Sequence, residues 1–176
     1  PSARLGPYAH PAHRKPVRRA ITLDQINEVL YEGAKVATIY PFPLYPNLQA
    51  FVDSPEVKAE EAKYNPGEFN LDKSAALMTE AGFTKDGDGL WEKDGKTINA
   101  TIDGFEGIHG DIVPILVEML RTGGFDASTN FGTDAYSNMA DGKDGLYMFG
   151  HGASLKDTCA ALELCTRRRS QGTGPS

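Results

Sequence analysis

Long apolar runs are missing from this sequence, and no stretch approaches the roughly 20 residues that a helix needs to cross a bilayer. The opening residues, Pro1 to Arg4, also lack the apolar core of a secretory signal. The chain does not begin with methionine, so we interpret it as a mature, trimmed or partial product. The missing signal therefore indicates little about the compartment.

Cysteine is scarce as well, with two residues among 176. Cys159 and Cys165 lie in a segment with helical spacing, and an intact helix would place them on different faces, where they could not form a disulfide. We expect two free, partly buried thiols. No spacing of His and Cys indicates a zinc site, and no cofactor is expected.

Positive charge is in the minority, because the formal net charge is −6. A nucleic-acid partner requires a concentrated positive field, so the net charge argues against a nucleic-acid-binding protein, and none is expected. Two local basic runs, at His13 to Arg19 and Arg167 to Arg169, stand beside Pro, Gly or Ser residues at the chain ends. We interpret both as solvated, mobile ends rather than binding patches.

What is present is an ordinary globular composition, with 40% hydrophobic and 24% charged residues. Residues 1–16 are rich in proline and carry no periodic pattern, which predicts an irregular lead-in. From Val17 to Tyr31 apolar residues recur at helical spacing with a change of phase near Leu23, which predicts a helix in one or two pieces. The proline-rich segment Tyr40 to Pro46 predicts an extended loop, whose rings either cover the core or offer a platform for a ligand.

The middle of the chain carries sharper signals. Asp72 is the expected N-cap of a helix that stops at Gly82. Two strands, Leu90–Lys93 and Lys96–Ile102, are expected to form a hairpin, because the Asp-Gly pair between them favours the positive φ of a tight turn.

The remainder alternates in type. We predict a helix over Asp111–Thr122, a strand over Phe125–Phe131, a helix over Thr133–Ala140, a strand over Leu146–Gly150 and a helix over Leu155–Leu164. Alternation of this kind predicts an α/β fold with a mostly parallel sheet, flanking helices and the hairpin. Ligands of such sheets bind beyond the carboxyl ends of the strands, so the loops at 103–109, 130–134 and 150–154 are the site candidates.

Several of these features occur in the order typical of a known family. They are the run Val17-Arg-Arg-Ala-Ile21, the helix Asp72–Gly82 followed by Phe83, the Asp-Gly turn before Leu90 and Trp91, and the hairpin at Asp94 and Gly95. Together they resemble the dipeptide and oligopeptide type of extracellular solute-binding protein of ABC importers. The resemblance runs from Val17 to Leu164 and implies a lobe of the periplasmic-binding-protein type II kind.

The chain departs from the family in its length and at a single residue. Family members are far longer, and this chain resembles only a stretch of their C-terminal half, so an intact cleft is missing. We therefore expect an irregular lead-in at 1–16, a partial solute-binding lobe at 17–165 and a disordered basic tail at 166–176. The residue after Asp157 is Thr158, where the family usually has proline.

The resemblance implies passive capture of a small solute, an oligosaccharide or an oligopeptide, in the bacterial periplasm or outside the cell. The partner would be an ABC permease in the membrane, and two lobes would close on the ligand by hinge motion. Glycines and neutral polar groups around His151, together with the nearby aromatic rings, favour an oligosaccharide slightly.

The expected ligand contacts are aromatic or imidazole rings at the carboxyl edge of the sheet. They are Phe105, Tyr136, Tyr147, Phe149 and His151. Tyr147 and Phe149 alternate with Met148 along a predicted strand, so at least one of the two sets must face the core.

Other interpretations remain. His151, Ser154 and Asp157 lie close in sequence and would serve a small hydrolase, although no Gly-x-Ser-x-Gly elbow surrounds the serine. A proteolytic remnant with exposed apolar surface would instead act as an interaction fragment and self-associate.

Two further patterns near residue 109 have unremarkable interpretations. Glu106, His109 and Asp111 could hold a metal, but such residues on glycine-rich loops are more often solvated. Gly104, Gly107 and Gly110 do not have the spacing of a dinucleotide-binding loop and predict a flexible connection.

Overall fold

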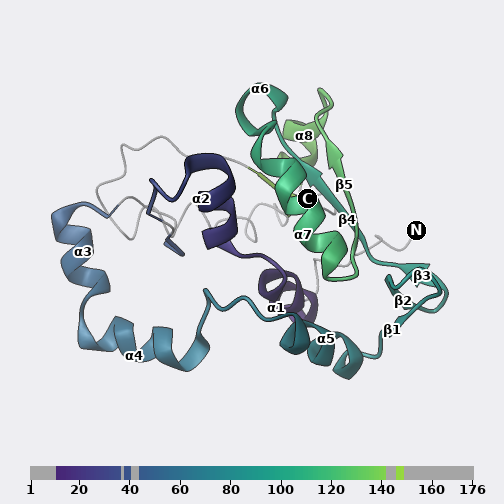
Figure 1. The fold of residues 1–176 in the computed structure, drawn as a ribbon, viewed down its shortest axis with the longest axis horizontal. Helices are drawn as coiled ribbons and strands as arrows, with labels where there is room; N and C mark the ends of the chain where they lie inside the picture. Colours follow the sequence, from purple (N-terminus) through teal and green to yellow (C-terminus); the bar gives the residue numbers. More distant parts are fainter. Residues whose placement is uncertain (1–10, 37, 41–43, 142–145, 149–176) are drawn as a thin grey trace, which may run out of the picture. The chain divides into compact units, whose positions relative to one another are not determined.

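The computed structural model describes residues 11–36, 38–40, 44–141 and 146–148 (Figure 1). The chain divides into two compact units. The first unit, in its described part, comprises residues 11–36, 67–141 and 146–148, and the second comprises residues 38–40 and 44–66. Each is described by itself. No helix within the described ranges is long and apolar enough to span a membrane.

A three-stranded parallel sheet forms the centre of the first unit. Its strands, in spatial order, are β5 (Asp126–Asn130), β4 (Asn99–Asp103) and β6 (Leu146–Tyr147). Both neighbours run parallel to β4, and the register pairs Asp103 with both Asn130 and Tyr147. The predicted α/β fold with a parallel sheet is confirmed, and the central strand ends at the residue where the first candidate loop begins.

Helices occupy the connections between these strands. They are α6 (Glu106–His109) and α7 (Ile112–Thr122) between β4 and β5, and α8 (Ala135–Ala140) before β6. Helix α7 packs on β4 and β5, and its residues Val113, Val117 and Leu120 are buried in the core at helical spacing (Figure 1). Gly124 follows the helix with φ of +87°, a conformation that favours glycine.

A second, antiparallel sheet is formed by β1 (Thr84–Lys85), β2 (Trp91–Lys93) and β3 (Lys96–Thr97). The hairpin turn at Asp94 and Gly95 has φ values of 54° and 69°, as the sequence predicted. Trp91 joins the hairpin to the turn after α7, because its Nε1 donates to the carbonyl of Gly123 at 2.8 Å.

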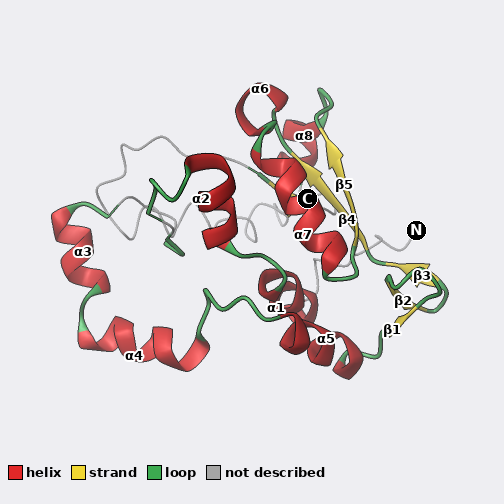
Figure 2. Cartoon of the chain, viewed as in Figure 1, coloured by secondary structure: helices red, strands yellow, loops and turns green. Residues whose placement is uncertain are grey.

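The prediction of one continuous strand over Lys96–Ile102 is wrong. The segment divides into β3 and β4, which belong to different sheets (Figure 2). Ile98 lies between them and serves both: its amide donates to the carbonyl of Trp91 at 3.0 Å, and its carbonyl accepts from the amide of Asp126 at 3.0 Å. Ile98 is also buried in the core, so the apolar pattern of the sequence shows no break between β3 and β4.

Two further helices, α1 (Pro11–Arg19) and α5 (Leu71–Glu80), pack on each other and contribute Val17 and Met78 to the core. The irregular lead-in predicted for residues 1–16 is therefore wrong from Pro11 onward. Pro16 lies inside α1 despite its missing amide hydrogen, because it is fully buried and its carbonyl accepts from the Ser74 hydroxyl at 2.8 Å. The burial of Pro16 therefore outweighs the low propensity of proline for the interior of a helix.

The predicted helix over Val17–Tyr31 is two helices, α1 and α2 (Leu23–Tyr31), as the change of phase near Leu23 indicated. The N-cap of α5 is Asn70 and not Asp72, because the Asn70 side chain accepts from the amide of Lys73 at 2.8 Å. The stop at Gly82 is confirmed, with φ of +84°.

The second unit contains two helices that the apolar pattern did not reveal. They are α3 (Pro46–Val52) and α4 (Pro55–Tyr64), each with proline in its first turn. Leu48 and Val52 form its small core, against which Tyr40, Leu44 and Val57 pack. The described residues of the predicted loop Tyr40–Pro46 are not helical up to Tyr45, and Pro46 begins α3.

Some predictions fall outside the described residues. They are the helix over Leu155–Leu164, the tail 166–176, both cysteines and the end of the strand predicted over Leu146–Gly150. These stay predictions.

Candidate functional site

Because the three strands of the parallel sheet run in one direction, their carboxyl ends meet at one edge. Asp103, Asn130 and Tyr147 are the last residues of the three strands. A small hollow of about 10 Å³ opens at this edge. Its lining consists of Asp103, Gly104, Phe105, Ala135, Tyr136, Tyr147 and Met148. We call this hollow with its lining the carboxyl-edge site.

Asp103 is the polar centre of the carboxyl-edge site. Only 5% of the residue is exposed, although carboxylates are seldom buried so completely. Its Oδ1 accepts from the side-chain amide of Asn130 at 2.5 Å and from that of Asn138 at 3.4 Å. Two side-chain amides therefore satisfy one oxygen of a buried carboxyl group.

The same two amides reach a second carboxylate. Asn130 donates to Asp134 Oδ1 at 3.3 Å, and Asn138 donates to Asp134 Oδ2 at 3.2 Å. Asn130 Oδ1 in turn accepts from the amide of Gly132 at 2.9 Å. These bonds fasten the end of β4 to the end of β5 and to the start of α8, so the loops at this edge have a defined shape.

Tyr147 forms a hydrogen bond with a residue of this network. Its hydroxyl donates to the backbone carbonyl of Asn138 at 3.1 Å. On the neighbouring residue, the amide of Met148 donates to the carbonyl of Asp103 at 2.9 Å, and the Met148 side chain packs against the core. The expectation that one set of alternating side chains faces the core is confirmed for Met148.

Phe105 contacts the buried His109 through both its backbone amide and its ring. His109 is 6% exposed, and its Nδ1 accepts from the amide of Phe105 at 3.1 Å, while the two ring centroids lie 5.9 Å apart. A Cβ at Gly104 would lie 3.3 Å from the Phe131 ring and 3.4 Å from His109 Nδ1, so glycine suits this close approach.

The connection that carries the three glycines contains the short helix α6, and its flexibility stays a prediction. Gly104 is buried and its amide donates to the carbonyl of Asn130 at 3.0 Å, and α6 follows directly. Gly104 is therefore closely packed at the start of this connection.

The structure brings three of the five predicted ligand-contacting residues together. Phe105, Tyr136 and Tyr147 all line the carboxyl-edge site, although they come from three different segments of the chain. Phe149 and His151 lie outside the described residues, as do Ser154 and Asp157 of the hydrolase alternative. Whether any of them contacts a solute stays a prediction.

Asn138 is a member of the network that the sequence did not point to. It lies one helical turn after Asp134, inside α8 and not in a loop. The spacing of four residues between an acid and an amide was the available signal, since such pairs face each other on a helix.

No group of three or more potential metal ligands lies in the part of the chain that the structure describes. Of the suggested set, His109 is buried against Phe105, whereas Glu106 and Asp111 are exposed. The interpretation of these acids as solvated side chains fits their exposure.

A larger hollow of about 440 Å³ also lies in the first unit, beside α2 and α7. Its lining is mostly apolar and includes Val29, Phe69 and Met119, with Gln25 and Glu118 among the polar groups. None of the predicted site residues within the described ranges lines it.

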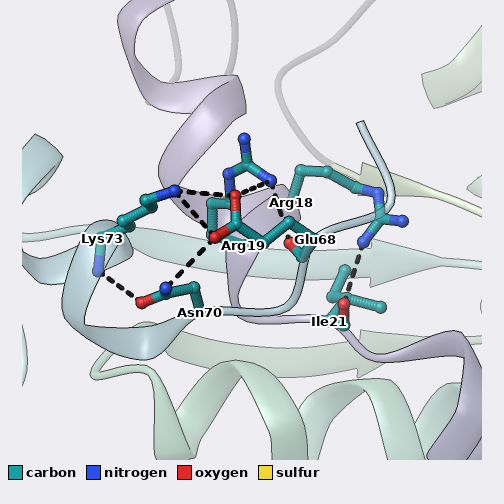
Figure 3. A network of polar contacts seen from close by, with 6 residues as sticks. All are labelled: Arg18, Arg19, Ile21, Glu68, Asn70 and Lys73. Carbon is teal, nitrogen blue, oxygen red and sulfur yellow. Dashed lines mark hydrogen bonds and ion pairs between the residues drawn. The ribbon is translucent and has the colours of Figure 1, made fainter. Parts of the chain in front are cut away.

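A second polar network joins α1 to the start of α5 (Figure 3). Lys73 Nζ donates to both carboxylate oxygens of Glu68 at 2.8 and 3.0 Å, and Arg19 Nη1 lies 3.0 Å from Glu68 Oε2. The hydrogen bond from Lys73 lowers the pKa of Glu68; burial opposes this shift, and the Asn70 amide and the charge of Arg19 support it.

Arg18 makes a separate contact beside this network. Its Nη1 donates to the carbonyl of Ile21 at 2.9 Å, and burial lowers the pKa of its guanidinium. The interpretation of the whole basic run as a solvated, mobile end is therefore wrong for Arg18 and Arg19. Both are partly buried and hold structural contacts.

Comparison with known proteins places this geometry in context. The family model described as "Bacterial extracellular solute-binding proteins, family 5 Middle" matches residues 4–172 of the chain. The oligopeptide-binding protein AppA of Bacillus subtilis (strain 168) is 31% identical over 123 residues, which are 65% of this chain and 21% of AppA.

Solved structures agree on the fold. AppA from Bacillus subtilis in complex with a nonapeptide has a TM-score of 0.57 at 21% identity, covering 77% of this chain and 25% of that chain. NikA from Brucella suis in complex with Fe(III)-EDTA has a TM-score of 0.64 at 20% identity, covering 86% of this chain and 30% of that chain. The predicted type II lobe is confirmed, and the chain spans about a fifth to a third of its relatives' length.

Proposed function

Because the chain belongs to family 5 of the bacterial extracellular solute-binding proteins, we propose that it forms part of the wall of a cleft that captures an oligopeptide. The captured peptide would pass to an ABC permease in the membrane, and the protein would act in the bacterial periplasm or outside the cell. The mechanism is passive: lobes close on the solute and release it to the permease.

The observation that carries this proposal is the carboxyl-edge site. Phe105, Tyr136 and Tyr147 line one hollow at the edge where parallel sheets bind ligands. Tyr136 is 56% exposed and Phe105 is 36% exposed, so both rings are accessible to a solute. Rings at such an edge cover apolar side chains of a peptide, and the adjacent backbone groups supply hydrogen bonds.

A peptide is favoured over an oligosaccharide by the relatives. AppA is named for oligopeptide binding, and its solved complex holds a nonapeptide. The slight preference for an oligosaccharide, drawn from the ring content near His151, finds no support in these comparisons. No catalytic step is part of the proposal, since the relatives are binding proteins.

The test is isothermal titration of the full chain with a nonapeptide, a tripeptide and a cello-oligosaccharide. We expect a peptide to bind, and Tyr136→Ala to weaken binding about tenfold, which corresponds to the loss of one good aromatic contact. Tyr31→Ala is the matched control, because Tyr31 is another exposed tyrosine of the first unit that does not line the site.

Binding of the oligosaccharide alone, or of no solute at all, would contradict peptide capture. Equal losses in Tyr136→Ala and Tyr31→Ala would remove the carboxyl-edge site from the proposal. Hydrolysis of the peptide, abolished by His151→Ala, would favour the enzyme.

Self-association stays a second prediction. The apolar hollow beside α2 and α7 is flanked by Val29 and Phe69, which are 59% and 46% exposed. Size-exclusion chromatography with light scattering measures it directly, and a clean monomer would count against it.

A further inference from the structure

Phe105 lines the carboxyl-edge site and is also the N-cap residue of α6. Its φ of −109° and ψ of 117° are extended, and no side-chain hydrogen bond caps the helix that follows. Phenylalanine has no side-chain acceptor for the first amides of a helix, and α6 has only four residues. The position of the Phe105 ring at the site therefore depends on other contacts.

His109 forms hydrogen bonds with both backbone groups of Phe105. The backbone amide of His109 donates to the Phe105 carbonyl at 2.7 Å, and its Nδ1 accepts from the Phe105 amide at 3.1 Å. A ring nitrogen that accepts a hydrogen bond carries no proton, so the ring proton of the neutral imidazole is on Nε2. The two bonds lie on either side of the Phe105 Cα, so together they restrict the direction of its side chain.

The imidazole also contacts the ring that it would position. The two ring centroids lie 5.9 Å apart with 41° between the ring planes. His109 is 6% exposed and does not line the hollow, whereas Phe105 is 36% exposed and does. A solute at the carboxyl edge therefore contacts Phe105 while His109 stays covered.

We propose that His109 is a positioning residue for solute binding, which holds the Phe105 ring at the carboxyl-edge site before the solute arrives. The proposal rests on the peptide capture proposed above. A segment that is already ordered in its binding conformation loses less entropy when the solute binds, so the affinity is higher. The atom responsible is Nδ1, since the backbone amide of any non-proline residue at this position would make the other bond.

The experiment is isothermal titration of the full chain with a nonapeptide, using two substitutions that differ in where they place an acceptor. His109→Asn carries its amide oxygen one bond from Cγ, as Nδ1 is, whereas His109→Gln carries it one bond farther along the side chain. We expect His109→Asn to bind within about twofold of the unaltered chain and His109→Gln about fivefold more weakly, which corresponds to one lost hydrogen bond. Equal affinities of the two variants would overturn the role of Nδ1.

A double-mutant cycle tests whether the effect passes through Phe105. Phe105→Ala alone should weaken binding about tenfold, as one aromatic contact is lost. Adding His109→Gln should then change the affinity by less than about twofold, because the ring to be positioned is absent. Independent losses that multiply to about fiftyfold would overturn the proposal.

Val117→Ala is the control for stability, because Val117 is a buried residue of α7 that does not line the site. It is expected to lower the unfolding temperature and to leave the affinity for the nonapeptide unchanged. A loss of affinity as large as that of His109→Gln would mean that binding follows stability in general, and would overturn a specific role of His109.

The outcomes separate the two proposals. If the unaltered chain binds no nonapeptide, both fail, whereas tight binding with equal affinities of the Asn and Gln variants overturns only the role of His109. If these variants do not fold, as judged by circular dichroism, nitrogen NMR of the unaltered chain decides. We expect Nδ1 of His109 to be unprotonated with and without the nonapeptide, and a proton on Nδ1 in either state would overturn the proposal.

Discussion

The two units differ in the size of the hydrophobic core against which their helices pack. In the first unit thirteen buried hydrophobic residues form one core between a parallel sheet, a hairpin sheet and three helices. In the second unit two residues, Leu48 and Val52, form the core, and no residue of α4 is fully buried, although Val57 packs against that core. The first unit therefore has the larger core to support a binding edge, whereas the helices of the second begin with a proline in their first turn and make mostly surface contacts.

The second unit compensates partly with polar contacts. The Tyr40 hydroxyl donates to Glu61, which also pairs with Lys58 at 2.9 Å. Burial raises the pKa of Tyr40, and the bond to Glu61 adds to this shift. Exposed ion pairs contribute little to stability, so these contacts do not replace a core.

The largest expected effect is in the first core. Phe125→Ala removes a fully buried ring and should destabilise the first unit by about 3–5 kcal/mol. Chemical denaturation followed by circular dichroism measures the loss. A change smaller than about 1 kcal/mol would mean that the core is not the source of stability in this unit.

Leu48→Ala tests the other side of the comparison. We expect a loss of about 2 kcal/mol within the second unit, because Leu48 is one of its two core residues. Amide hydrogen exchange should show faster exchange in α3 and α4 and no change in β4, β5 and α7. Acceleration in both units would show that they unfold together.

A smaller effect is expected at the start of α5. Asn70→Ala should cost about 1 kcal/mol, since the side chain caps the helix through the amide of Lys73. Asp72→Ala is the matched comparison and should cost less than about 0.5 kcal/mol, because its charge acts only through the helix dipole. The reverse order in thermal unfolding would restore Asp72 as the cap.

The smallest effect concerns Glu68 and depends on pH. Its pKa is lowered in the folded chain, so the stabilisation is present above the ordinary pKa of a glutamate and is lost as pH falls through the folded value. Glu68→Gln should therefore lower the unfolding temperature near neutral pH, and the difference from the unaltered chain should vanish in acid. A difference that is constant with pH would assign the effect to lost packing.

The sequence was sufficient for the parallel sheet, the hairpin turn and α7, since each has a strong local pattern that agrees with its packing. It was insufficient at Ile98, where one buried residue serves two sheets and makes two strands look like one. It also failed for α4, whose helix forms from a proline start and charged residues without an apolar stripe.

The candidate site was predicted in outline because parallel strands fix where loops converge. Phe105 and Tyr147 follow from that rule. The burial of Asp103 and its hydrogen bonds could not be predicted in this way. The two amides that donate to it, of Asn130 and Asn138, belong to β5 and α8, far along the chain. Such long-range hydrogen bonds leave no periodic trace in the sequence.

Hydrogen exchange of the chain with and without a bound nonapeptide tests most directly whether the carboxyl edge of the first unit's sheet holds the solute. The account predicts slower exchange at residues 103–109, 130–138 and 146–148, with little change in α3 and α4. Slower exchange confined to the second unit, or to the segments of α2 and α7 around the larger hollow, would contradict it.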